Sequence, residues 1–225
     1  MIPLARVYAR VLLRRWSTWA VIAGAVLVAI VGVSLDLFGF DGSPSRSAGM
    51  IVGTFEIGAI LLAVSGRLSG VASEDSEGFR AAIVQAMGAT AVDLGATIGV
   101  AVAAGAVSWL GVGVVFVLYI YMGQMAADVP RAFVVALALM GESAVAAAWA
   151  GIGARVAGRV AGAATGMAAF AIARLDVPLG VRACLPAPLP SDVAGMLVSL
   201  GTAALAATGL VLVTGALPAV GEGSP

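Results

Sequence analysis

The feature that most constrains this chain is a series of long apolar runs with few polar residues between them. Hydrophobic residues make up 61% of the 225 residues and charged residues 11%, against roughly 45–50% and 25% in an average soluble domain. A soluble protein of this length could not cover so much apolar surface, so the expected solvent is a lipid bilayer. We therefore expect an all-α polytopic membrane protein, with residues 1–225 forming one transmembrane domain.

Six apolar stretches are candidates for membrane spans, since a span needs about 20 residues. They cover residues 18–38, 49–65, part of 94–127, 132–154, 156–173 and 193–217. The third stretch is longer than one span and could hold a tight hairpin near Gly111 and Gly113. Each half of such a hairpin would be barely long enough to cross the membrane, so we expect one long helix there.

Arginine distribution predicts the orientation of these spans, because cytoplasmic loops carry an excess of basic residues. With six spans and both termini in the cytoplasm, eight arginines lie inside and four outside. The inner set is Arg6, Arg10, Arg14, Arg15, Arg67, Arg80, Arg155 and Arg159, and the outer set is Arg46, Arg131, Arg174 and Arg182. A hairpin in the third stretch would reverse the later assignments.

Residues 1–16 combine arginines with apolar residues at helical spacing. Leu4, Val7, Tyr8, Val11 and Leu12 fall on one face, which predicts an amphipathic helix in the membrane interface. A simple basic flank before the first span is an equal alternative. The spread of the arginines and the missing small-residue cleavage site argue against a cleavable signal peptide.

Several classes of function are disfavoured by composition. A formal net charge of zero argues against nucleic-acid binding. The chain has no His and a single cysteine, Cys184, so common metal sites and most acyl-transfer triads lack a central member. It also has no G-x-x-x-x-G-K-[ST] motif, so any nucleotide site would belong to another chain. We expect neither catalysis nor a cofactor on this chain.

A short polar segment, residues 73–88, separates the second and third stretches. Ser73 is predicted to cap a helix whose first turn carries Glu74, Asp75 and Glu77. Phe79, Ile83 and Met87 repeat at i, i+4 and i+8 and form an apolar stripe. Such a stripe can pack into a groove of a soluble partner or lie on the bilayer.

This layout resembles the permease subunits of ABC-2-type transporters. The matching positions in the segment are Glu74, Asp75, Glu77, Gly78, Ile83, Val84 and Gly95. Departures from the family pattern are Phe79, Arg80, Ala81, Met87 and Ala96. The likeness covers nearly the whole chain in layout but only about twenty residues in motif. The same layout is also similar to the haem-exporter permease family of cytochrome c maturation.

The resemblance implies a transport subunit in the bacterial inner membrane that moves a hydrophobic or amphipathic substrate outward. A separate ATPase would dock on the coupling helix, residues 73–88, and a second copy or a related permease would complete the path. The implied coupling residues are Glu74, Asp75, Glu77, Gly78, Phe79, Arg80, Ile83 and Met87. Membrane lipid is the other expected partner.

Glu56 and Glu142 each lie in the middle of a predicted span, where an ionised carboxylate costs at least about 2.5 kcal/mol. They could belong to a substrate path or a proton site, or be structural carboxyls bonded to Thr54, Ser143 or Thr165. No basic residue lies in mid-span, so we expect no buried ion pair. Glu56 is the preferred path residue, because its span leads into the coupling helix, and a structural role is favoured for Glu142.

Two further features concern packing. Gly158, Gly162 and Gly166 recur at four-residue spacing, which allows close helix contact and is expected mainly within the chain. In the extracytoplasmic loop of residues 174–192, Pro178, Pro186, Pro188 and Pro190 exclude a long helix. That loop could hold short interfacial helices or be an ordered connection.

A proton-coupled secondary transporter using Glu56 and Glu142 is the alternative from a different class. Against it, the sequence shows no obvious inverted repeat and no second pair of spans broken by Gly or Pro. An intramembrane enzyme lacks a plausible catalytic set.

Overall fold

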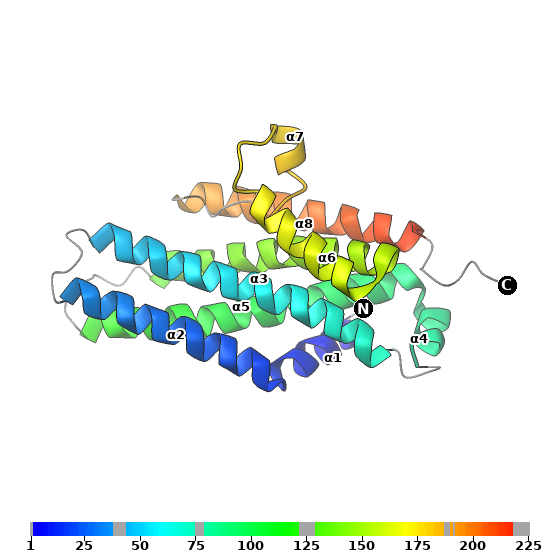
Figure 1. Ribbon diagram of the computed structural model, residues 1–225, viewed down its shortest axis with the longest axis horizontal. Helices are drawn as coiled ribbons and strands as arrows, with labels where there is room; N and C mark the ends of the chain where they lie inside the picture. Colours follow the sequence, from blue (N-terminus) through cyan, green and yellow to red (C-terminus); the bar gives the residue numbers. More distant parts are fainter. Residues whose placement is uncertain are drawn as a thin grey trace.

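A computed structural model describes residues 2–37, 44–74, 79–121, 129–186, 190 and 192–217. These residues form helices and no strand, which confirms the all-α prediction (Figure 1). The helices are α1 (Ile2–Leu13), α2 (Trp16–Leu37), α3 (Pro44–Glu74), α4 (Phe79–Met87), α5 (Ala89–Tyr121), α6 (Val129–Ile172), α7 (Leu179–Arg182) and α8 (Val193–Ala216).

The long helices α2, α3, α5 and α8 run along the long axis of an elongated bundle (Figure 1). Helix α6 packs against α3, α5 and α8 and so links the two sides of the bundle. The short helices α1 and α4 lie toward the end at which α8 finishes (Figure 1). Much of the core consists of alanines, including Ala59, Ala63, Ala103 and Ala147, which lets helix backbones approach closely.

Three helices are long and apolar enough to cross a membrane. They cover Ala89–Gly113 in α5, Val134–Ile172 in α6 and Val193–Ala216 in α8, among the described residues. The bent pair Pro3–Leu13 and Trp16–Gly32 raises the number to four if it forms one span. These helices indicate a membrane protein, but they do not amount to the six separate spans predicted from the sequence.

Helix α6 contains a sharp break that divides it into two packed halves. Ala157 has φ −143° and Gly158 has φ 82°, and the second value favours glycine because it lacks a Cβ. The break lies close to the boundary between the predicted stretches 132–154 and 156–173. The Thr165 hydroxyl, in the second half, lies 3.1 Å from the Trp149 carbonyl oxygen of the first half and 2.9 Å from the Ala161 carbonyl oxygen of its own half.

The glycine repeat packs within the chain, as predicted, for two of its three members. A Cβ at Gly162 would lie 2.7 Å from the Ala150 carbonyl oxygen and 2.7 Å from Leu68 Cδ2. One at Gly166 would lie 2.8 Å from Val64 Cγ2. Gly158 forms the break itself, and a Cβ there would meet no described atom within 4 Å.

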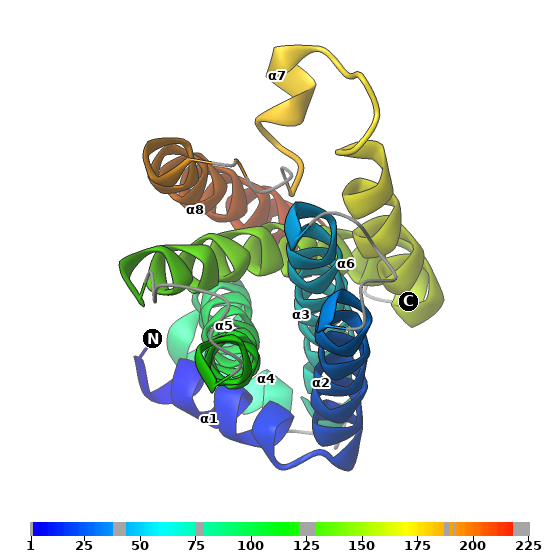
Figure 2. The ribbon, with the colours of Figure 1, turned by 90° about the vertical axis from the view of Figure 1, so that its left-hand side faces the viewer.

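Helix α5 is continuous from Ala89 to Tyr121, which confirms one long helix and excludes a hairpin at Gly111 and Gly113. Helix α1 crosses beneath it (Figure 2). A Cβ at Gly99 would lie 2.9 Å from Tyr8 Cβ, and Tyr8 and Leu12 are buried. The predicted helix thus exists, and part of its apolar face is covered by protein, whereas Val7 on the same face is exposed.

We expect Gly162→Leu to destabilise the protein by about 1–3 kcal/mol, because the added side chain must displace the Ala150 backbone or Leu68. The measurement is the free energy of unfolding in mixed micelles with a denaturing detergent. Gly201→Leu in α8 is the matched control, since a Cβ there would meet no described atom within 4 Å. Equal stability of the two variants would contradict close packing within α6.

Candidate functional site

The predicted coupling helix, residues 73–88, differs from its predicted form. Helix α3 continues to Glu74, so Ser73 is an internal helix residue near the C-terminal end of α3 and not an N-cap. Glu74 is therefore at the wrong end of a helix to stabilise an N-terminus. The prediction was wrong because the turns before Ser73 continue the helix instead of stopping it. Asp75, Glu77 and Gly78 lie outside the described residues.

A short helix is nevertheless present, as α4, and it packs against α5. Its end is defined by Gly88, whose φ is 81° and whose N–H donates to the Val84 carbonyl at 2.7 Å. Ile83 and Val84 are half-buried, whereas Met87 is exposed. Part of the predicted stripe is thus used for intramolecular contact. The side chains of Phe79 and Arg80 are not among those that the structure describes.

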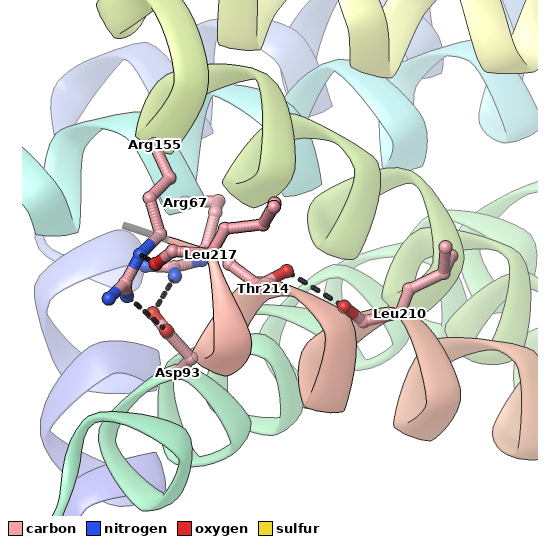
Figure 3. A network of polar contacts seen from close by, with 6 residues as sticks. All are labelled: Arg67, Asp93, Arg155, Leu210, Thr214 and Leu217. Carbon is pink, nitrogen blue, oxygen red and sulfur yellow. Dashed lines mark hydrogen bonds and ion pairs between the residues drawn. The ribbon is translucent and has the colours of Figure 1, made fainter. Parts of the chain in front are cut away.

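Close to α4, three charged side chains form what we call the Asp93 cluster (Figure 3). Asp93, in the first turns of α5, accepts from Arg67 of α3 through Oδ1. Its Oδ2 lies 3.4 Å from Nη1 of Arg155 in α6. Arg155 Nε also donates to the Leu217 carbonyl, just beyond α8, at 2.7 Å. One carboxylate and two guanidiniums therefore join four helices.

The Asp93 cluster is almost closed to solvent, since Arg67 and Asp93 are each 3% exposed. Arg67 passes Gly151 on its way to Asp93, and a Cβ at Gly151 would lie 3.2 Å from Arg67 Nε. Burying an unpaired charge costs several kcal/mol, so the pairing keeps these side chains in the bundle. Sequence reasoning used Arg67 and Arg155 only for orientation and did not consider Asp93. The available signal was opposite charges at the ends of neighbouring apolar stretches.

A second group of charges lies nearer the N-terminal end of α3. Glu56 pairs with Arg174, which follows the last residue of α6 by two positions. Arg174 also donates to the Phe170 carbonyl at 2.8 Å, and its guanidinium carbon lies 3.4 Å from the centre of the Phe170 ring. The sequence predicted no buried ion pair, and this pair is partly exposed, at 30% for the Arg174 side chain and 13% for that of Glu56. The pair was not anticipated, because the second half of α6 folds back along α3 and brings Arg174 to the level of Glu56.

Glu142 completes this second group, which we call the Glu142 cluster. Its electrostatic neighbours are Glu56 and Arg174. The residue is 1% exposed, and neither carboxyl oxygen has a hydrogen-bond partner among the described residues. Two carboxyl groups can hydrogen-bond to each other only when one carries a proton.

Two of the three hydroxyl groups that the sequence offered as partners for these carboxyls, those of Thr165 and Ser143, make no hydrogen bond to them. Thr165 donates to backbone carbonyls within α6. The buried hydroxyl of Ser143 has no hydrogen-bond partner in the described part of the chain. Glu56 is engaged by Arg174 instead.

An apolar layer separates the two clusters. Glu56 and Arg67 lie on the same helix, about 16 Å apart at 1.5 Å per residue. Between them, Ile60 and Val64 of α3 pack against Ala146 and Ala150 of α6. Polar chemistry is thus concentrated at two levels of the bundle.

The described residues contain no group of three or more His, Cys, Asp or Glu that could hold a metal ion. No protein-family model, curated protein or solved structure matches this chain. The family resemblance therefore rests on the residues and the layout described above.

We expect Asp93→Asn to destabilise the protein by about 3 kcal/mol, because it removes the carboxylate that pairs with buried Arg67 and half-buried Arg155. The free energy of unfolding in mixed micelles is the measurement. Asp176→Asn, at an exposed position, is the control for loss of a carboxylate. A cost below about 1 kcal/mol for Asp93→Asn would contradict an energetic role for the Asp93 cluster.

Proposed function

We propose that this chain is the membrane-spanning permease subunit of an ABC-2-type exporter driven by a separate ATPase. The observation that supports this most is the arrangement of α3, α4 and α5. A short helix lies between two long ones, at the end of the bundle that also holds α1 and the Asp93 cluster (Figure 1). The missing nucleotide-binding motif is consistent with a partner that hydrolyses ATP.

The proposal includes six spans with both termini in the cytoplasm. Residues Val134–Ile172 form 39 helical residues, about 58 Å if straight, which is nearly twice the roughly 30 Å of a bilayer core. The break at Gly158 would turn that length into two spans. Together with α2, α3, α5 and α8 these make six crossings, with α4 and Arg155 on the cytoplasmic side.

Force from a docked ATPase would reach the bundle through α4. This helix contacts α5, and Asp93 in the following turns is bonded to α3 and α6. A push on α4 would therefore act on three helices at once. A homodimer, with transport of a hydrophobic or amphipathic molecule along the interface, would supply two such helices related by symmetry.

We expect labelling by a membrane-impermeant maleimide to place the loops on opposite sides. Native Cys184 is exposed and should react in intact cells, as should Ser43→Cys made in a Cys184→Ser background. Gly223→Cys in that background should react only after permeabilisation. Labelling of positions 43 and 223 from the same side would refute the topology.

We also expect a photo-crosslinking residue at Gln85, which is exposed on α4, to capture an ATPase that contains a G-x-x-x-x-G-K-[ST] motif. The full chain is expressed in its native host, and the products are identified by mass spectrometry. The same residue at Val181 in α7, also exposed, is the control and should capture no ATPase.

Combining Phe79→Ala with Ile83→Ala should reduce the Gln85 product several-fold, because it removes apolar contacts from α4. Membrane insertion, measured by the labelling pattern above, should not change. Crosslinks to lipid alone, or an ATPase captured equally at both positions, would count against docking on α4.

A further inference from the structure

The Glu142 cluster holds one carboxyl group more than its arginine can balance. Glu56 pairs with Arg174, whereas both oxygens of Glu142 lack a hydrogen-bond partner in the described structure. Burying a polar group without a hydrogen bond costs free energy, and burying a charge without a partner costs more. The site therefore needs one further positive charge, and Glu142 is too enclosed, at 1% exposure, to admit a large cation.

We propose that Glu142 and Glu56 form a binding site for one exchangeable proton. With the proton on Glu142, that side chain is neutral and Arg174 balances the negative charge of Glu56, so the cluster carries no net charge. The charged groups that face Glu142 are Glu56 from α3 and Arg174 beyond α6. Helices α3 and α6 are held in the register that brings the carboxyls together by the packing of Ile60 and Val64 on Ala146 and Ala150.

Exposure of the three side chains indicates the route of exchange. The side chain of Arg174 is 30% exposed and that of Glu56 is 13% exposed, whereas Glu142 is 1% exposed. A proton thus enters from the end of α6 that carries Arg174, passes to Glu56 and reaches Glu142. This reverses the assignment from the sequence, in which Glu142 was structural.

Release of the proton leaves two carboxylates to one guanidinium. Arg174 already donates to Glu56 through Nη2 and to the Phe170 carbonyl through Nη1. These bonds use two of the five N–H groups of Arg174, and a bond to Glu142 would require the side chain to move toward it. Proton exchange is therefore coupled to the position of Arg174 and of the chain that follows α6. The site is independent of the proposed function, since it needs no ATPase.

The test uses infrared difference spectra of the purified full chain in lipid nanodiscs, recorded across a pH titration. We expect the carbonyl stretch of a protonated carboxyl group that shifts in D₂O and titrates with pH. Glu142→Gln should remove this band, and Glu56→Gln should remove or shift it. Asp176→Asn, an exposed carboxylate in the loop after α6, is the matched control and should leave it unchanged.

Arg174→Gln tests whether Arg174 acts on the proton electrostatically, because the pH midpoint of the band would not change if Arg174 were only structural. Without the positive guanidinium the proton should be held to higher pH, so the midpoint of the band should move in the alkaline direction. Circular dichroism checks that each variant is folded. If Glu142→Gln does not fold, the two single variants Glu56→Gln and Arg174→Gln still test the proposal. A band insensitive to both glutamate variants, or an unchanged midpoint in Arg174→Gln, would overturn the proposal.

Discussion

The cost of placing charge inside an apolar helical bundle determines the arrangement of this molecule. Every ionised side chain that enters the bundle must find a counter-charge or a hydrogen bond. Arg67 and Asp93 meet this requirement at one level, and Glu56 and Arg174 meet it at another. Between these levels the core is apolar and rich in alanine. The positions of helices relative to one another are therefore fixed both by shape and by a few ion pairs.

Small residues are what make those pairs possible. Gly158 lets α6 turn back on itself, and Gly162 and Gly166 let the returning half lie close against α3. This return brings Arg174 next to Glu56. At the Asp93 cluster, Gly151 leaves room for Arg67 to reach Asp93. A larger residue at Gly151, Gly162 or Gly166 would separate the helices and, with them, the charges.

The sequence was sufficient for local features and insufficient for pairing between distant segments. Apolar runs predicted the long helices, and the glycine spacing predicted contact within the chain. It did not predict the Glu56–Arg174 pair, because the partners are 118 residues apart and meet only through the fold of α6. Ser73 was misjudged as a cap, because capping residues also occur inside helices when the helix continues past them. Asp93 was overlooked, since its role depends on α3 and α6 together.

The two clusters also differ in which helices they join, and this bears on how motion could pass through the bundle. Helices α3 and α6 contribute to both clusters and pack together along the layer between them. Helix α5 contributes Asp93 to one cluster, and α4 is attached to α5. A displacement that starts at α4 would thus strain the Asp93 bonds first.

The ion pairs of the two clusters have no side chain in common among the described residues, so interactions at the two levels should be energetically separate. A change of charge at one level acts on the other across about 16 Å, a distance that weakens the electrostatic interaction between them. The packing of Ile60 and Val64 on Ala146 and Ala150 provides a mechanical connection between the levels, through which α3 and α6 can move as one unit.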